Sequence, residues 1–342
     1  MASKASVGPA LPAAVLLMGP TAAGKTATAM ALYDRWPVSL ISVDSAQVYQ
    51  GLDIGSAKPD PASLERYPHE LIDLREPECT YSAADFVADA EAAMHRAAAA
   101  GRTPVLVGGT VLYYRALLYG LDPLPAADAA LRASIAERAR RQGWAALHAE
   151  LRKLDPETAA RLRPSDPQRI QRALEVLELT GRGLSDHHRH PRLPRFRSLR
   201  LVLTPADRAR LHCQIADRVD RMLAAGLLAE LEVLRRRPGL TRDHAAMKSV
   251  GYRQVWELLD GRYGPDELRP RIIAATRQLA KRQLTGLRKF SGTLWYDSVR
   301  SRTIDGVCRQ VGGFCRPGSG SRPLVFSGPQ SGSFKVPHTH NN

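Results

Sequence analysis

The segment Gly19-Pro20-Thr21-Ala22-Ala23-Gly24-Lys25-Thr26 constrains the fold of this 342-residue chain more than any other feature. It fits the pattern G-x-x-x-x-G-K-[ST] of phosphate-binding loops. An apolar run at 14–18 precedes it and a helix-forming run at 26–33 follows it. In a strand, loop and helix that follow one another in this way, backbone N–H groups and the helix N-terminus surround phosphate oxygens. The lysine neutralises phosphate charge, and the threonine hydroxyl reaches a bound Mg²⁺. The sequence therefore predicts a polyphosphate site, without identifying the polyphosphate as ATP.

Strand-like and helix-like segments alternate through the first 120 residues. The expected elements are strands at 38–43 and 104–107 and helices at 81–100, with Ser82 as N-cap, and at 112–118. Such alternation is typical of an α/β fold in which helices flank a parallel sheet, as in P-loop NTPases. Ligands of such sheets bind at the carboxyl ends of the strands. The phosphate loop, Asp44-Ser45 and Gly109-Thr110 each follow a strand, so we expect them to share one cleft.

Beyond residue 122 helical segments replace the alternation until a strand-like run at 199–203, and Gly, Ser, Pro and Arg dominate after residue 303. The expected divisions are a flexible N-terminus at 1–13, a core domain at 14–121 and 199–303, an all-helical insertion at 122–198 and a disordered tail at 304–342.

The formal net charge of +15 suggests a polyanionic partner, most simply nucleic acid, although a genome rich in arginine codons would give the same surplus. The helix-forming segment 271–289 places apolar residues on one face and six cations on the other: Arg271, Arg277, Lys281, Arg282, Arg288 and Lys289. A solvated face is the alternative to a surface that follows a nucleic-acid backbone.

Four widely separated cysteines include no C-x-x-C pair, so neither a zinc site nor a disulfide framework is indicated. The histidine-rich run 187–190 lacks partner ligands at helical spacing, and no metal is expected there. The first residues lack a secretory signal pattern, and no run of about 18 apolar residues could span a membrane. We expect a cytoplasmic, monomeric protein.

Several further segments accompany the phosphate loop, and together the chain resembles the tRNA dimethylallyltransferases, which act on adenosine 37 of tRNA. The matching segments are 19–26, 44–49, 53–59, 68–73, 107–113, 168–175, 251–254 and 281–285, so the resemblance extends over residues 14 to 300. A single phosphate loop would be weak support, whereas this many segments in order are specific.

The resemblance implies transfer of a dimethylallyl group from dimethylallyl diphosphate to N6 of adenosine 37. The departing diphosphate would bind Gly19, Pro20, Thr21, Ala22, Ala23, Gly24, Lys25 and Thr26. Mg²⁺ would be held by Thr26 and Asp44. Asp44 is also the candidate base that takes the N6 proton, and holding Mg²⁺ through water is its rival role. Thr110 would hydrogen-bond the reacting region, although it could also cap the next helix.

The target base must leave the stacked anticodon loop to reach such a cleft. The tRNA contacts implied by the resemblance are Asp44, Ser45, Ala46, Gln47, Thr110, Arg132, Gln168, Arg169, Ile170, Gln171, Arg172, Met247, Lys248, Ser249, Val250, Gly251, Tyr252, Lys281, Arg282, Gln283, Leu284, Thr285 and Arg288. Helix capping is the alternative for Gln168, and a core position is the alternative for Tyr252. Gly286 and Gln214 depart from the family pattern, which has a bulky and a basic residue there.

Two other functions fit a phosphate loop. A small-molecule kinase or ATPase would use the helical insertion as a lid, and an NTPase switch would bind nucleic acid without group transfer. The kinase interpretation leaves the basic helix and the +15 charge unexplained. The prenyltransferase interpretation accounts for both.

Overall fold

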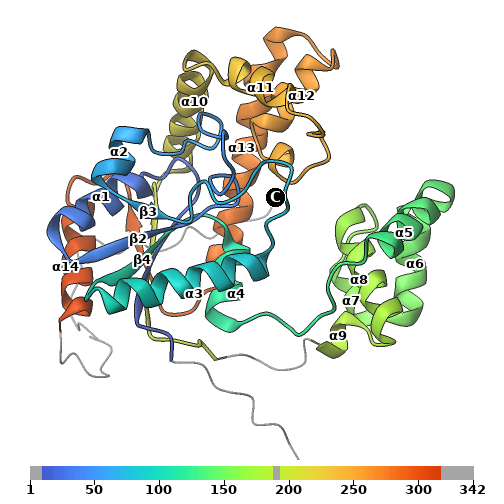
Figure 1. Ribbon diagram of the computed structural model, residues 1–342, viewed down its shortest axis with the longest axis horizontal. Helices are drawn as coiled ribbons and strands as arrows, with labels where there is room; N and C mark the ends of the chain where they lie inside the picture. Colours follow the sequence, from blue (N-terminus) through green and yellow to red (C-terminus); the bar gives the residue numbers. More distant parts are fainter. Residues whose placement is uncertain (1–9, 188–192, 317–342) are drawn as a thin grey trace, which may run out of the picture. The chain divides into compact units, whose positions relative to one another are not determined.

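One parallel sheet forms the centre of the larger part of the molecule (Figure 1). The computed structural model describes residues 10–187 and 193–316, and within them six strands lie in the order β3-β2-β4-β1-β5-β6. The strands are β1 Ala14–Met18, β2 Val38–Val43, β3 His69–Glu70, β4 Thr103–Gly108, β5 Ser198–Thr204 and β6 Thr293–Asp297. Every pair is parallel. The expected α/β architecture is confirmed, and the carboxyl ends of all strands share one edge.

The chain divides into two compact units. One contains residues up to Leu118 and from Arg195, and the other is Tyr119–Pro194, close to the insertion expected at 122–198. The helices of the first unit are α1 Lys25–Arg35, α2 Pro61–Arg66, α3 Ala83–Ala99, α4 Val111–Tyr119, α10 Arg208–Ala224, α11 Leu227–Arg235, the 3₁₀ turn η1 Ala246–Lys248, α12 Tyr252–Leu259, α13 Pro265–Leu287 and α14 Thr303–Cys315.

The core follows from alternation along the strands. Val15 and Leu17 of β1 are fully buried in a cluster with Leu32 of α1 and Val307 of α14. Side chains at the intervening positions, such as Leu16, point to the opposite face of the sheet. On that face α3 contacts β2 and β4. The sheet is therefore covered on both faces, which explains its almost continuously apolar strands.

Helix boundaries follow local signals. Ser82 caps α3, as predicted, by accepting a hydrogen bond from the Asp85 N–H, and the Asp85 carboxylate accepts from the Ser82 N–H in return. Two consecutive helices, α10 and α11, follow β5. Gly226, with φ of 98°, divides them, because that conformation strains other residues. This break redirects α11 toward the loop that follows β2.

The smaller unit is all-helical within its described residues (Figure 1). Its helices are α5 Ala129–Gln142, α6 Trp144–Leu154, α7 Pro156–Arg161, α8 Pro167–Thr180 and α9 Leu184–His187. Glu175 has a fully buried side chain and accepts hydrogen bonds from Arg132 Nε (2.8 Å), Arg172 Nη1 (2.6 Å) and the Asp128 N–H (2.9 Å). A buried carboxylate needs such partners, so these two arginines have a structural role.

The C-terminal tail expected to be disordered at 304–342 is a helix over its first part. Residues 303–315 form α14, which packs against α1 and buries Val307, Cys308 and Val311. Tertiary burial of this apolar stripe outweighs the low helix propensity of its three glycines. Residues 1–9, 188–192 and 317–342, which include most of the histidine-rich run, lie outside the described residues.

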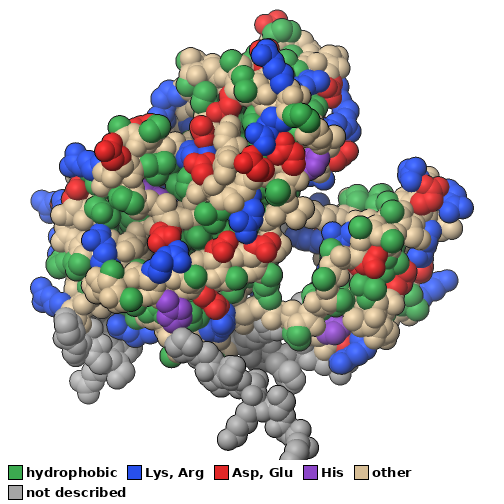
Figure 2. All heavy atoms as spheres, viewed as in Figure 1, with side chains coloured by type: hydrophobic (Ala, Val, Ile, Leu, Met, Phe, Trp, Pro, Cys, Tyr) green, Lys and Arg blue, Asp and Glu red, His purple; other side chains and the backbone are tan. Residues whose placement is uncertain are grey.

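Charges of both signs are mixed on the face shown in Figure 2, where acidic side chains lie among the lysines and arginines. The +15 surplus is therefore not gathered into one block on this face. None of the helices in the part of the chain that the structure describes is long and apolar enough to cross a membrane.

Candidate active site

The phosphate loop, residues Gly19–Thr26, lies between β1 and α1 at the carboxyl edge of the sheet. Two of its residues adopt left-handed conformations, Ala22 with φ of 65° and Gly24 with φ of 77°. A side chain at Gly19 would place its Cβ only 2.4 Å from the Leu203 carbonyl oxygen of β5. The loop thus curls tightly against the sheet, and the first N–H groups of α1 have no acceptor within the helix. An anion can accept from them.

Gln283 of α13 joins two loops of the site. Its side-chain Oε1 accepts the Thr21 N–H (2.9 Å), and its Nε2 donates to the Gly109 carbonyl (3.1 Å). One correction follows: the Thr21 amide is already bonded, so it is not free to hold a phosphate as expected. Gln283 also lines two cavities of this site, so its expected contact with tRNA stays a prediction.

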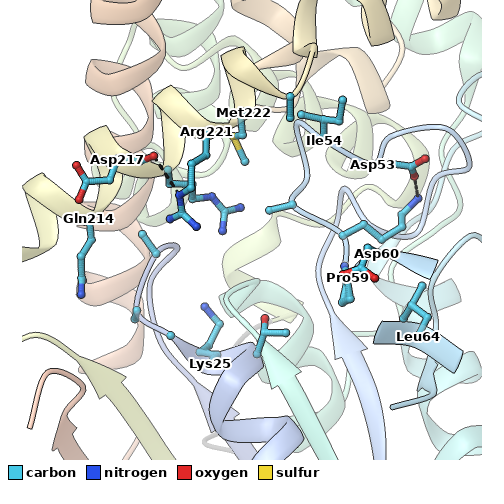
Figure 3. A pocket seen from close by; sticks show the side chains of 18 of the residues that line it. Lys25, Asp53, Ile54, Pro59, Asp60, Leu64, Gln214, Asp217, Arg221 and Met222 are labelled. Carbon is cyan, nitrogen blue, oxygen red and sulfur yellow. Dashed lines mark hydrogen bonds and ion pairs between the residues drawn. The ribbon is translucent and has the colours of Figure 1, made fainter. Parts of the chain in front are cut away.

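A cavity of about 700 Å³ lies beside the phosphate loop and is here called the first cavity (Figure 3). Four cations line it: Lys25, Lys58, Arg218 and Arg221. Lys25 enters from below and donates to the Pro20 carbonyl (2.7 Å), while Arg218 and Arg221 come from α10. Burial, and secondly Arg218, lowers the pKa of Lys25 to about 8, although Asp44 opposes the shift. Burial also lowers the pKa of Arg218, against the attraction of Asp44. Lys58 is already paired with Asp53 and Asp73, so Lys25, Arg218 and Arg221 are the cations of this cavity that suit a bound anion.

Asp44 and Thr110 end two neighbouring strands and lie close together. Asp44 Oδ1 accepts the N–H groups of Ala46 (2.8 Å) and Gln47 (3.4 Å), which closes a turn and fixes the carboxylate. Thr110 Oγ1 accepts the Ser45 N–H (3.2 Å), so its hydroxyl binds the Asp44 turn. The hydroxyl therefore bonds the Asp44 turn and does not cap α4, which was the alternative role of Thr110.

Two further cavities meet the first. The second, of about 480 Å³, is lined by Asp44, Thr110, Gln283 and by residues 248–251. The third, of about 70 Å³, is lined by Lys25, Thr26, Asp44, Gln47 and Arg218. Phosphate-loop residues therefore line a small chamber together with the candidate base, between two larger openings. His69 of β3 also lines the third cavity, and its Nδ1 is bonded to the Tyr67 carbonyl.

The loop 53–58, which follows the Asp44 turn, contributes walls to these cavities. Its inner side meets Arg218, whose Nη2 donates to the Ser56 carbonyl (3.3 Å). Its outer side meets Glu230 of α11, which accepts the Ile54 N–H (2.7 Å) and the Tyr252 hydroxyl (2.6 Å). Arg218 and Glu230 were not singled out from the sequence, because nothing in their neighbouring residues marks them.

Three residues expected to touch tRNA are core residues. Ile170 and Tyr252 have no exposed surface, and Met247 is 1% exposed. Each closes a helix or turn against the rest of its unit, and the expectation of direct contact is wrong for them. The Tyr252 hydroxyl bonds Glu230, which satisfies the core alternative named for it.

The remaining expected tRNA contacts differ in accessibility. Lys248, Lys281, Arg282, Thr285 and Arg288 are exposed in the first unit, and Gln168 and Arg169 are exposed in the second. Asp166, not Gln168, caps α8. Arg271 is bonded to Glu267, so the cationic face of α13 is partly neutralised at its first turn.

Gln214 and Gly286, the two departures from the family pattern, lie in different surroundings. Gln214 lines the first cavity with its Oε1 buried and without a hydrogen-bond partner. Gly286 lies against α4, where an added Cβ would come within 2.7 Å of Val111 Cγ1. A bulky residue could not occupy position 286 beside Val111.

The donor set limits how a metal could bind. No group of three or more His, Cys, Asp or Glu residues suited to a metal occurs in the described ranges. Thr26 and Asp44, which carry a hydroxyl and a carboxylate, line the same small chamber. This site offers few oxygen donors, and they lie beside a phosphate site. Such a donor set fits Mg²⁺, because Mg²⁺ takes waters and phosphate oxygens as its other ligands.

The chain is similar to known proteins over most of its length. A family model described as IPP transferase matches residues 47–290. The tRNA dimethylallyltransferase of Thiobacillus denitrificans is 57% identical over 290 residues, covering 84% of this chain and 93% of that protein. The tRNA dimethylallyltransferase of Dechloromonas aromatica is 53% identical, with 90% and 98% covered.

Two solved structures are similar. The tRNA isopentenylpyrophosphate transferase of Bacillus halodurans has a TM-score of 0.66 at 34% identity, with 88% of this chain and 96% of that chain covered. A eukaryotic dimethylallyltransferase, described as acting on tRNA, has a TM-score of 0.71 at 23% identity, with 88% and 77% covered. The latter likeness supports the fold alone.

Proposed function

The chain belongs to the IPP transferase family, and from this premise we propose that it transfers a dimethylallyl group from dimethylallyl diphosphate to N6 of adenosine 37 in tRNA. One observation carries the proposal. Lys25 and Arg218, which suit a diphosphate, line the same small chamber as Asp44, which suits an amine proton. The chamber thus holds the groups for both halves of a prenyl transfer.

The donor half requires stabilisation of a leaving anion. The C1–O bond of the allylic diphosphate breaks as positive charge develops on carbon and negative charge on the departing oxygen. The first N–H groups of α1 donate to the phosphate oxygens, and Lys25 and Arg218 supply positive charge. Because burial weakens the protonated state of Lys25, the bound anion and the lysine stabilise one another strongly.

The acceptor half requires removal of a proton. The N6 lone pair of adenine is delocalised into the ring, and bond formation to C1 acidifies the amine. Asp44 accepts that proton through the carboxylate oxygen that the turn leaves available. The turn holds the carboxylate in place, and the Thr110 hydroxyl holds the turn.

Mg²⁺ fits beside Thr26 and Asp44, where it would neutralise charge on the diphosphate. The extruded adenine would enter through the second cavity, whose rim includes Lys248 and Arg282. Exposed cations of α13 and the polar residues Gln168 and Arg169 of the helical unit would bind the anticodon stem and loop. We further propose that the protein acts as a monomer in the cytoplasm.

The test is transfer of radiolabel from dimethylallyl diphosphate to unmodified tRNA in the presence of Mg²⁺. We expect label in RNA, lost when adenosine 37 is replaced by guanosine. ATP hydrolysis without label transfer would instead support the ATPase interpretation and overturn this one. A tRNA lacking the anticodon loop serves as the negative control.

A further inference from the structure

Glu230 of α11 binds the loop 53–58 from behind, and no catalytic role accounts for it. Its Oε2 accepts the N–H groups of Asp53 (3.1 Å) and Ile54 (2.7 Å). Its Oε1 accepts the Gly55 N–H (3.2 Å) and the Tyr252 hydroxyl (2.6 Å). A carboxylate that accepts three consecutive backbone N–H groups holds a loop firmly, because such charge-assisted bonds are stronger than neutral ones.

The Tyr252 ring packs directly against the backbone of the same loop. A Cβ at Gly55 would lie 2.5 Å from the Tyr252 ring and 2.9 Å from Leu227, so the backbone rests directly on these side chains. Burial raises the pKa of Tyr252, and the Glu230 charge raises it further, so the hydroxyl stays a donor. The loop therefore has little room to move toward α11 and α12.

The opposite side of the loop presents carbonyl groups to residues of the reaction chamber. The Ser56 carbonyl accepts from Arg218 Nη2 (3.3 Å), and the Ala57 carbonyl accepts from Gln47 Nε2 (3.2 Å). Gln47 also accepts from the Ser42 hydroxyl (3.1 Å) beneath the Asp44 turn. A shift of the loop would thus move the Arg218 guanidinium, the only α10 cation that lines all three cavities in the described structure.

We propose that Glu230 and Tyr252 are positioning residues, which fix the loop 53–58 so that its carbonyls aim Arg218 at the departing diphosphate. The inference rests on the proposed function and deepens it. Neither side chain touches substrate. Their effect reaches the reaction through Arg218, so it belongs to the donor half and not to tRNA capture.

The experiment compares Glu230→Gln and Tyr252→Phe with the native protein. Glutamine keeps the size of the side chain but has one acceptor oxygen. Either the Asp53 and Ile54 N–H groups or the Gly55 N–H and Tyr252 hydroxyl therefore lose their acceptor. Phenylalanine removes only the hydroxyl. Glu232→Gln makes the same chemical change at an exposed position of α11 and is the matched control.

Two measurements are made on each variant: the dissociation constant of inorganic diphosphate, and single-turnover label transfer with saturating tRNA. For Glu230→Gln we expect the diphosphate constant to rise and the rate constant to fall, each by about tenfold. For Tyr252→Phe we expect a change of about threefold in the same directions. The tRNA dissociation constant and all values for Glu232→Gln should equal those of the native protein.

A purely structural role gives a different pattern. It would reduce the amplitude of the single turnover, which counts folded enzyme, and leave the rate constant and the diphosphate constant unchanged; that pattern overturns the inference. If Glu230→Gln does not fold, Tyr252→Phe decides by the same criteria. Absence of transfer by the native protein would refute the proposed function, while the diphosphate constants would still test the positioning role.

Discussion

Replacing Gly286 with alanine sets two opposing effects against each other. In a helix interior this change stabilises by about 1 kcal/mol, because glycine has greater backbone freedom when unfolded. At position 286 the added Cβ would lie 2.7 Å from Val111 Cγ1, 3.0 Å from Cγ2 and 3.2 Å from Cβ. Contacts between carbon atoms are optimal at about 3.5–4.0 Å, so Val111 must move.

The steric effect should win. Overpacking of this kind costs about 1–3 kcal/mol, and valine has little rotamer freedom with which to escape. With a midpoint of about 2 kcal/mol for the clash, Gly286→Ala should lower the free energy of unfolding by about 1 kcal/mol. Because Val111 follows Thr110, the same displacement should also slow label transfer.

Urea denaturation of a double-mutant cycle tests this reasoning. In a Val111→Ala background the methyl groups are absent and only the Cβ contact at 3.2 Å remains, so Gly286→Ala should there no longer destabilise and should stabilise by up to about 1 kcal/mol. Gly313→Ala in α14 is the matched control, since its Cβ would have no neighbour within 4 Å and should not destabilise. Stabilisation by Gly286→Ala in the native background would refute the argument.

Three further outcomes are expected. Binding of inorganic diphosphate, measured by calorimetry, should weaken by up to about tenfold per pH unit above pH 8, because Lys25, whose pKa is lowered to about 8, loses its positive charge there; a Lys25→Met variant that kept this inflection would contradict the assignment. Asp44→Asn preserves the acceptor of its turn and should slow single-turnover transfer by about 10²–10⁴-fold without weakening tRNA binding. If that variant loses tRNA affinity while the bound complex reacts normally, the base role is wrong. Lys281→Ala should weaken tRNA binding and make its salt dependence shallower by about one unit of log–log slope, whereas Arg271→Ala, already paired with Glu267, should not; equal slopes for both variants would remove α13 from the RNA-binding surface.

Local signals explain what the sequence predicted well. The phosphate loop has a fixed spacing, strands such as 38–43 are continuously apolar, and Ser82 carries its own capping partner three residues later. Helix α5 of the insertion likewise ends before Gly143, a residue type that commonly follows a helix. Each of these features depends on residues within about one helical turn or one strand, which a linear pattern contains.

The errors share a different cause. Arg218 and Glu230 act through partners more than 160 positions away in the chain, and nothing near them in sequence marks those contacts. The apolar stripe of α14 is stabilising only when it packs against α1. The local sequence does not contain that contact, and its glycines favour an irregular segment. Tyr252 lies in a segment that matches the family, but such a match does not separate contact with tRNA from packing, and its ring is fully buried.

The hydrogen bond between Thr21 and Gln283 joins groups that are 262 positions apart. While a ribosome is still translating the region between them, the loop near the start of the chain has no partner for that amide, and the reaction chamber lacks one of its walls. The small chamber, with Gln283 in its wall, is therefore complete only after α13 has left the exit tunnel.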